Sequence, residues 1–313
     1  MSGVQRELIS IVTTLRNEEK NLVELIRQLR ASLSGLGDNY EIIFVDDDST
    51  DTSFEILSRF AAEDKKIKLL RTSRRFGVYE CLFGGLRYAK GAAVIYLESD
   101  LQDPPELIPE MIRQWRDESA DVVHTTRKER LGETWFKIKL TQLAYRIINK
   151  ISEVPIPENT GDYKLLSRRA LDHLLTMTEF DPYYRGLVSW VGFKQTYVYF
   201  SRKARFSGTS QRGIMSLAPL KVFLSAITSF SNLPLFLVFV PAVVLSAFLI
   251  FFPIGFCLDW FSIRDLLGIA ICLQVIIGIF IFGFMGAQNL YIARIFKQIR
   301  SRPSFIVSEE INF

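Results

Sequence analysis

Oxygen-bearing side chains follow one largely apolar run, residues 94–97. They are Glu98, Asp100 and Gln102, and Asp103 comes directly after them. This order places carboxylate and amide oxygens at the carboxyl end of a predicted strand, where open α/β sheets bind their ligands. Such oxygens suit Mg²⁺ or Mn²⁺, and these ions in turn bind diphosphates. The segment therefore predicts a metal–diphosphate site, with capping of the next helix by Asp103 as the plainer alternative.

A second acidic group follows the strand-like run that ends at Val45. It consists of Asp46, Asp47 and Asp48. Because the carboxyl ends of parallel strands meet at one edge of a sheet, the two acidic groups together predict a site for a nucleotide diphosphate. The structural alternative is that Asp51 caps the helix that follows.

The first two thirds of the chain alternate between strand-like and helix-like segments. We expect strands over residues 8–13, 41–45, 67–71, 92–97 and 121–125, and helices over residues 18–36, 51–63, 79–89 and 105–116. Strands alternating with helices of this length indicate βαβ units and an α/β fold with a mostly parallel sheet.

Two uncharged apolar runs stand near the carboxyl end, over residues 233–256 and 266–287. Each is long enough to cross a bilayer as a helix. Lys and Arg residues cluster outside both runs, whereas the short turn at 257–265 carries two acids and one Arg. The positive-inside rule therefore places both flanks in the cytoplasm and the turn outside. The alternative is a buried helical hairpin in a soluble core.

Segments 133–151 and 214–231 mix aromatic, aliphatic and basic residues at helical spacing. This pattern is typical of helices that lie in the membrane interface, although a core-facing helix has the same period. We therefore divide the chain into a cytosolic catalytic domain (1–213), an interfacial helix (214–231), a transmembrane hairpin (232–290) and a cytosolic tail (291–313).

Composition excludes several other classes of protein. Three cysteines in 313 residues form no disulfide framework or zinc site, which fits a reducing compartment. The net charge is +4, and acids dominate the predicted cleft, so we expect no nucleic-acid partner. We interpret His124 and His173 as core or surface filling.

The chain resembles a known family in four ordered motifs. They are Asn17-Glu18-Glu19, Val45-Asp46-Asp47, the segment 100–106 (DLQDPPE) and Asn159-Thr160-Gly161-Asp162. Over essentially its whole length it resembles glycosyltransferase family 2, and more narrowly the polyisoprenyl-phosphate glycosyltransferases. The resemblance implies a Rossmann-like GT-A catalytic domain, a divalent metal (Mg²⁺ or Mn²⁺) and inversion at the anomeric carbon.

The resemblance also implies the reaction and its setting. A single sugar would pass from a UDP- or GDP-sugar to a polyprenyl phosphate of the undecaprenyl or dolichyl type at the cytoplasmic membrane face. The lipid-linked sugar would then serve glycan or lipid modification outside the cell. A homo-oligomer, such as a tetramer, is implied as well.

Site residues are carried over by position in this sequence. The nucleotide pocket would be lined by Thr14, Arg16, Glu18, Val45, Asp47 and Ser99. The metal and diphosphate would be held by Glu98, Asp100 and Gln102. The acceptor phosphate would contact Arg127, Lys137, Arg205 and Gln211. Four of the expected site residues would act directly in catalysis, namely Asp162, Asp100, Arg127 and Arg205.

Asp162 has three possible tasks at this stage. It orients a sugar hydroxyl, orients an Arg, or takes the last proton from the acceptor. A turn residue after Gly161 is the structural alternative.

Several positions depart from the family pattern. Thr14 and Arg16 stand where Pro and Tyr are usual, Asp48 replaces a Gly, Glu98 replaces an Asp, and Gln211 replaces a Lys. These departures leave the donor unidentified and motivate one alternative, a membrane-anchored nucleotide-sugar-binding scaffold with impaired catalysis. Another alternative is a processive polysaccharide synthase, for which we expect a Gln-x-x-Arg-Trp motif after the catalytic domain; the sequence lacks it.

Overall fold

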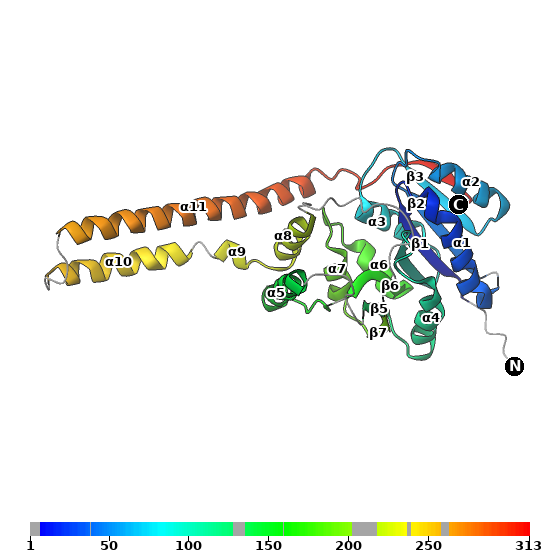
Figure 1. Cartoon of the computed structure of the whole chain (residues 1–313), viewed down its shortest axis with the longest axis horizontal. Helices are drawn as coiled ribbons and strands as arrows, with labels where there is room; N and C mark the ends of the chain where they lie inside the picture. Colours follow the sequence, from blue (N-terminus) through cyan, green and yellow to red (C-terminus); the bar gives the residue numbers. More distant parts are fainter. Residues whose placement is uncertain are drawn as a thin grey trace.

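The structure, a computed structural model, describes residues 7–37, 39–127, 135–158, 160–201, 218–236, 239–257 and 263–313. One eight-stranded mixed sheet forms its centre, in the order β7-β5-β6-β4-β1-β2-β3-β8. The strands are β1 (Ile9–Leu15), β2 (Tyr40–Asp46), β3 (Ile67–Thr72), β4 (Ala93–Glu98), β5 (Val122–Arg127), β6 (Thr160–Ser167), β7 (Gln195–Phe200) and β8 (Val307–Ile311). Helices cover both faces of this sheet (Figure 1).

The predicted βαβ units form the parallel part of the sheet. β1 pairs in parallel with β2 and β4, and β2 pairs in parallel with β3. One face is covered by α1 (Glu19–Leu33), α2 (Ser53–Glu63) and α4 (Ile108–Asp117), and the other by α3 (Val78–Tyr88), α6 (Arg168–Thr176) and α7 (Tyr184–Trp190). β1 and β2 are buried along their whole length, as expected for strands covered on both sides. The predicted α/β class is confirmed.

Three strands were missed by the sequence analysis. β6 runs antiparallel between β4 and β5, β7 pairs in parallel with β5, and β8 pairs antiparallel with β3. These strands pair with strands that are distant in the sequence, so a local alternation of strand-like and helix-like segments does not predict them. β7 and β8 form the two ends of the sheet, whereas β6 lies inside it and carries Asp162.

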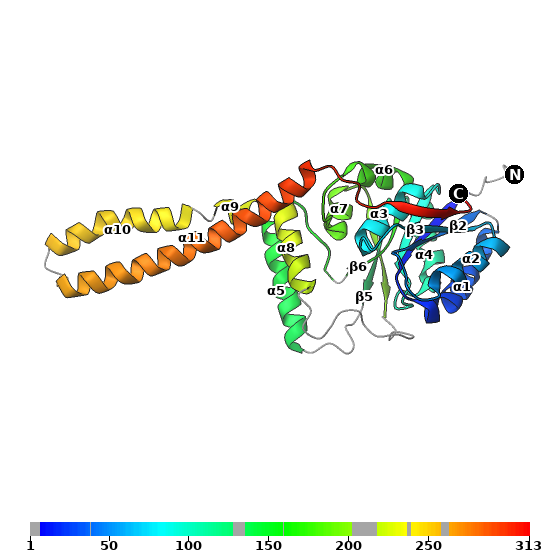
Figure 2. The same cartoon turned by 90° about the horizontal axis from the view of Figure 1, so that it is seen from above.

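The segment 291–313, expected to be a cytosolic tail, contributes the end of one helix and a strand of the sheet. Its first residues continue α11 (Ile263–Ile299), and β8 then completes the sheet beside β3 (Figure 2). The Asn312 side-chain amide donates to the carbonyls of Ala61 (2.6 Å) and Ile67 (2.8 Å). The chain therefore returns from the helical hairpin to the edge of the central sheet, because that edge offers unpaired backbone groups.

The carboxyl-terminal helices project away from the sheet as an antiparallel pair, α10 (Phe239–Cys257) and α11 (Figure 1). Two stretches, Leu233–Phe251 and Leu267–Ile299, are long and apolar enough to cross a membrane, and neither is buried in the protein. A hairpin inside a soluble core would be buried instead. This exposure of apolar side chains favours the membrane interpretation.

Three shorter helices lie between the hairpin and the sheet: α5 (Trp135–Ile151), α8 (Ala218–Phe230) and α9 (Leu233–Phe236). At the base of the hairpin, Arg294 of α11 donates to the carbonyls of Ser225 (3.2 Å) and Asp181 (3.0 Å). Gln298 donates to the carbonyl of Thr178 at 2.6 Å. These contacts tie α11 both to α8 and to the segment between α6 and α7.

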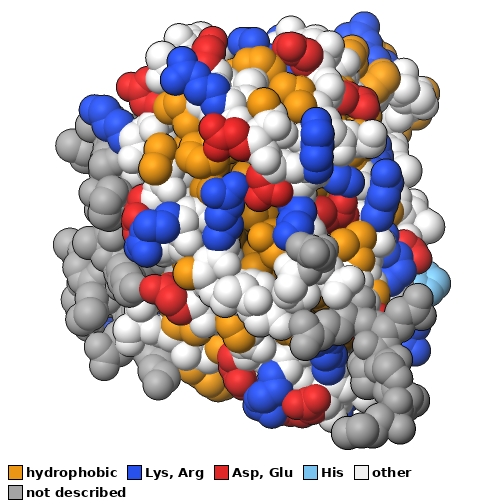
Figure 3. Space-filling model, turned by 90° about the vertical axis from the view of Figure 1, so that its right-hand side faces the viewer, with side chains coloured by type: hydrophobic (Ala, Val, Ile, Leu, Met, Phe, Trp, Pro, Cys, Tyr) orange, Lys and Arg blue, Asp and Glu red, His pale blue; other side chains and the backbone are white. Residues whose placement is uncertain are grey.

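The opposite end of the protein has a different surface. Lys, Arg, Asp and Glu side chains are interspersed there with small apolar patches (Figure 3). Mixed charges of this kind are typical of a face in contact with water. The charged end and the apolar hairpin thus lie at opposite ends of the long axis (Figure 1).

Candidate active site

The central strand β1 brings the two acidic groups together. Thr14 pairs with Val45 of β2 on one side and with Glu98 of β4 on the other. The carboxyl ends of β2 and β4 are therefore separated only by the end of β1. This register confirms the expected meeting of both acidic groups at one sheet edge.

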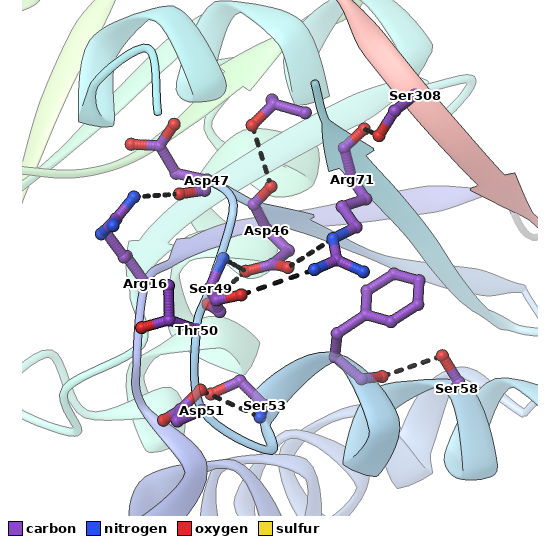
Figure 4. Close-up of polar contacts among 12 residues, drawn as sticks. Arg16, Asp46, Asp47, Ser49, Thr50, Asp51, Ser53, Ser58, Arg71 and Ser308 are labelled. Atoms are coloured by element: carbon purple, nitrogen blue, oxygen red, sulfur yellow. Dashed lines mark hydrogen bonds and ion pairs between the residues drawn. The ribbon is translucent and has the colours of Figure 1, made fainter. Parts of the chain in front are cut away.

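Asp46 has a structural role in the turn after β2. Its buried carboxylate accepts hydrogen bonds from the Ser49 hydroxyl and from the Ser49 backbone N–H (3.2 Å), and the Arg71 guanidinium lies 3.8 Å away (Figure 4). Burial raises the pKa of Asp46, and the contacts with Ser49 and Arg71 oppose that rise. Because its carboxylate binds Ser49 in the same turn, Asp46 contributes to the site by holding the loop that follows β2.

Asp47 turns the other way and joins β2 to the start of α3. Its carboxylate oxygens accept the backbone N–H groups of Phe76 (2.6 Å) and Gly77 (3.0 Å). A carboxylate at the amino end of a helix is also stabilised by the helix dipole. The backbone carbonyl of Asp47 accepts a hydrogen bond from Arg16 at 2.8 Å (Figure 4). Asp47 and Arg16 thus fix the two loops that flank the predicted nucleotide pocket.

The other residues expected in this pocket differ in their placement. Thr14 lies at the sheet edge, where its hydroxyl is 3.0 Å from the Tyr96 hydroxyl. Glu18 precedes α1 and accepts from the side chain of Asn21. Val45 is buried in the core under α3, so its side chain does not line an open pocket. The family resemblance implied Val45 for this pocket; its side chain is buried because helices cover both faces of β2, and a backbone contact of Val45 with the nucleotide stays a prediction.

The Asp100 loop is tightly folded. The Asp100 carboxylate accepts the backbone N–H of Gln102 at 3.1 Å, and Leu101 between them has a positive φ of 60°. Ser99, Asp100 and Asp103 are all buried. A left-handed residue at this point reverses the chain, so that Asp100 and Gln102 follow Glu98 within one compact turn.

The donor set of this turn fits a shared metal ion. Among the described residues, no cluster of three or more His, Cys, Asp or Glu side chains is placed to hold a metal by itself. Mg²⁺ in nucleotide sites is usually bound by one or two carboxylates together with phosphate oxygens of the substrate. Asp100, with Glu98 and Gln102 nearby in the sequence, matches that pattern. The turn therefore fits an ion that a diphosphate would help to hold.

Asp162 forms the centre of a buried ionic group. Its carboxylate accepts from the Arg185 guanidinium through Nε (2.8 Å) and Nη2 (3.2 Å), and from the Tyr79 hydroxyl (3.3 Å). Arg185 also donates to the Tyr145 hydroxyl at 3.2 Å. Burial is the largest influence on Asp162 and would by itself raise its pKa. The charge and hydrogen bonds of Arg185, the charge of Lys164 and the Tyr79 hydrogen bond together outweigh burial and lower that pKa. Asp162 is therefore held ionised and oriented toward an arginine.

Arg127 stands at the end of β5, close to Asp162 in the sheet. Its guanidinium lies 3.7 Å from the position that a Cβ on Gly161 would occupy. The last paired residues of β4 and β6 are Tyr96 and Lys164, so the end of β4 at Glu98 and the start of β6, which contains Asp162, lie at the same edge. Glu98, Arg127 and Asp162 thus gather at the same sheet edge.

Three expected acceptor residues are not placed by the structure. Arg205 and Gln211 lie outside the described residues, as does Asn159 of the fourth motif. Lys137 lies in α5, but its side chain is outside the described part of the chain. Their assignment to the acceptor phosphate stays a prediction.

Sequence analysis missed Arg185, Tyr79 and Lys164, which surround Asp162. A usable signal existed for Arg185, since it is the one charged residue in the otherwise uncharged segment Tyr184–Trp190. A lone charge among buried residues needs a partner. Lys164 offered a similar signal, because it stands in the middle of a β-strand that is buried throughout.

Comparison with known proteins gives three findings. The profile described as Glycosyl transferase family 2 matches residues 10–175. The chain is 36% identical over 304 residues to an uncharacterized glycosyltransferase of Bacillus subtilis, YkcC, covering 96% of this chain and 93% of that protein. It is 31% identical over 303 residues to a prophage bactoprenol glucosyl transferase homolog of Escherichia coli, covering 96% and 98%. Both alignments include the sheet and the helical hairpin.

A solved structure with a similar fold is glucosyl-3-phosphoglycerate synthase from Mycobacterium tuberculosis, in complex with Mn²⁺, uridine diphosphate and phosphoglyceric acid. The TM-score is 0.48 at 20% identity, covering 71% of this chain and 78% of that chain.

Proposed function

The chain belongs to glycosyl transferase family 2, and from that premise we propose that it transfers one hexose from a nucleotide-diphosphate sugar to a polyprenyl phosphate. One observation carries the proposal. The similarity to a protein named for bactoprenol glucosyl transfer covers nearly the whole of both chains, the apolar hairpin included. A lipid acceptor explains why a catalytic sheet is joined to two exposed apolar helices.

The proposed location is the cytoplasmic face of a membrane, with the hairpin as anchor and both termini in the cytoplasm. Lys and Arg flank the hairpin on the side of the sheet, in agreement with the positive-inside rule. A single cysteine introduced in the 257–265 turn of a cysteine-free variant would test this topology. Labelling of intact cells with an impermeant thiol reagent is expected there, and not for a cysteine at exposed Asp117.

The acceptor determines which chemistry the protein must supply. A phosphate monoester has a second pKa of about 6, so its oxygen is already largely anionic at neutral pH. Attack of that oxygen on the anomeric carbon breaks the bond to the nucleotide diphosphate and inverts the configuration. The protein must therefore bring two anions together and stabilise the departing diphosphate, rather than create a strong nucleophile.

Asp100, Glu98 and Gln102 are the residues that would hold a divalent ion with the diphosphate. That ion would supply charge neutralisation to the leaving group. Arg127 lies beside Gly161 at the same edge, and we assign it to the acceptor phosphate, which a guanidinium would bind by charge-assisted hydrogen bonds.

Asp162 is proposed to act through Arg185 rather than as the main base. A carboxylate with a lowered pKa that is paired with a guanidinium is a weak proton acceptor. Pairing instead keeps the arginine side chain in one orientation near the site. This geometry favours the second of the three roles considered for Asp162, the orientation of an arginine.

The test is a donor screen with the full-length protein in detergent. The protein would be incubated with Mg²⁺ or Mn²⁺, undecaprenyl phosphate and a panel of UDP- and GDP-hexoses, and products would be identified by mass. We expect one donor to give a polyprenyl-phosphate monosaccharide. Asp100→Ala is expected to abolish product, whereas Asp117→Ala, which removes an exposed acid at the end of α4, is expected to leave it unchanged.

Two outcomes would contradict the proposal. Nucleotide binding without product across the panel would support the scaffold alternative. Repeated addition of sugars to one acceptor would support a processive synthase.

A further inference from the structure

Strand β6 carries a bulge at Asp162. His124 of β5 pairs with Lys164 of β6, and the next recorded pair is Thr126 with Thr160. Two residues along β5 thus correspond to four residues along β6. Two extra residues are therefore accommodated on β6 between these pairs, and Asp162 lies at the centre. Bulges near active sites often re-aim a side chain, and here the bulged residue is the carboxylate that binds Arg185.

Side chains donate hydrogen bonds to two backbone carbonyls within the bulge. Lys164 donates from Nζ to the Gly161 carbonyl at 2.8 Å, and Thr125 donates from its hydroxyl to the Tyr163 carbonyl at 2.9 Å. Buried carbonyls need such partners, since an unpaired one is costly. The backbone on both sides of Asp162 is thus held by these two side chains.

Lys164 is also the start of a buried polar chain. Its Nζ lies 3.1 Å from His124 Nδ1, and His124 Nε2 lies 2.7 Å from the side-chain oxygen of Gln195. An ammonium can only donate, so His124 accepts at Nδ1 and carries its proton at Nε2, where it donates to Gln195. Burial lowers the pKa of His124 to about 3, which keeps the ring neutral.

Burying a lysine only to bind one carbonyl is energetically unfavourable, because a neutral amide could donate the same hydrogen bond without a buried charge. Lys164 has only 1% of its surface exposed. Charged groups face it from several elements: Asp162 on its own strand, Asp103 after β4, and Arg185 on α7. The two carboxylates favour the charged ammonium, Arg185 opposes it, and His124 on β5 is neutral. Burial nevertheless lowers the pKa of Lys164 to about 7.

We propose that Lys164 is a positioning residue for sugar transfer, which fixes the bulge that aims Asp162 and supplies a second positive charge beside its carboxylate. The inference rests on the proposed function and deepens it. In this arrangement Arg185 binds the carboxylate directly, while Lys164 holds the backbone that presents it. Loss of the Lys164 charge would weaken the placement of Asp162 and Arg185 without touching the nucleotide pocket at β1 and β2.

The test compares three variants of the full-length protein in the hexose-donor assay with undecaprenyl phosphate. Lys164→Gln keeps a donor for the Gly161 carbonyl but removes the charge, and Lys164→Met removes both. Thr125→Val is the matched control, because it removes the other bulge hydrogen bond without altering charge. We expect Lys164→Gln to lower kcat by about tenfold to a hundredfold with donor KM unchanged, and Thr125→Val to be far milder.

The dependence of turnover on pH distinguishes a role of the Lys164 charge from a merely structural role, because a merely structural role would not change this dependence. Wild-type turnover is expected to fall as pH rises through about 7, because the ammonium then loses its proton. This falling limb should be absent from Lys164→Gln. If thermal denaturation shows that Lys164→Met does not fold, the comparison of the pH profiles of Lys164→Gln and the wild type still tests the role of the Lys164 charge.

The results separate the two proposals. Glycolipid formation by the wild type tests the proposed function alone. Wild-type kcat in Lys164→Gln, or an identical pH profile in both proteins, overturns the role of Lys164 and leaves the function standing. A wild type that makes no glycolipid overturns the function, and the role of Lys164 in transfer falls with it.

Discussion

Arg185 and Asp162 form a two-point ion pair, with Nε 2.8 Å from one carboxylate oxygen and Nη2 3.2 Å from the other. The two residues come from α7 and β6 and are both largely buried. Such a pair fixes orientation as well as charge, because the planar guanidinium matches the plane of the carboxylate. The pair links the base of the apolar hairpin to the central sheet, since the segment before α7 is held by Arg294 of α11.

Breaking the pair from one side should be worse than removing both charges. Arg185→Met leaves a buried carboxylate without its main partner, and we expect a loss of about 3 to 5 kcal/mol in the free energy of unfolding. The double variant Arg185→Met/Asp162→Asn should recover part of that loss. Chemical denaturation of the wild type, the single variants Arg185→Met and Asp162→Asn and the double variant measures the coupling, and additive effects would contradict a direct pair.

Turnover should depend strongly on Asp162. Asp162→Asn keeps the size of the side chain but loses the charge that orients Arg185, and we expect kcat to fall by about a hundredfold. Donor KM should change little, since the nucleotide pocket that we propose lies at β1 and β2. A variant within a few-fold of wild type would exclude both the base and the orienting role.

Asp47 should contribute to stability through the loop before α3. Asp47→Asn offers only one acceptor oxygen to the two N–H groups of Phe76 and Gly77, so we expect about 1.5 to 3 kcal/mol of destabilisation. Asp48→Asn is the matched control, because Asp48 has a positive φ of 54° that asparagine tolerates well. Equal effects of the two substitutions on the unfolding midpoint would speak against the Asp47 contacts.

The protein should lose stability as the pH falls through the range in which His124 gains a proton. Burial lowers the pKa of His124 to about 3 in the folded protein, against an ordinary value of about 6.5. Between these values the unfolded chain binds a proton that the folded protein does not, so the free energy of unfolding declines as pH drops. The full contribution is present above about pH 6.5. Unfolding curves of wild type and His124→Phe should differ in this slope, and parallel slopes would rule out the assignment.

Gly186 should resist replacement because α7 packs closely on α8. A Cβ at this position would lie 2.4 Å from the Phe230 ring and 2.8 Å from the Tyr183 ring. Gly186→Ala is therefore expected to cost about 1 to 3 kcal/mol of stability and to shift Arg185 from Asp162. Gly35→Ala, where a Cβ would meet no atom within 4 Å, is the control and should be neutral or stabilising. Thermal unfolding of both variants gives the comparison.

The sequence determined the class of the fold and the edge at which the site lies. Apolar runs ending in Asp46–Asp48 and in Glu98–Gln102 specify buried parallel strands and acidic strand ends, because period and burial are local properties. The two uncharged runs likewise specified the exposed hairpin by length and composition alone.

Only the tertiary structure decided what each acid does. Asp46 and Asp47 are adjacent in sequence, yet one holds its own turn and the other holds the loop before α3. Val45 was expected in the pocket and its side chain lies in the core, because helices cover both faces of β2. The pairs of Asp162 with Arg185 and of Lys164 with His124 join elements that are far apart in the chain. Such partners are fixed by sheet register and by the bulge in β6, which result from packing of the whole domain and leave no local pattern to read.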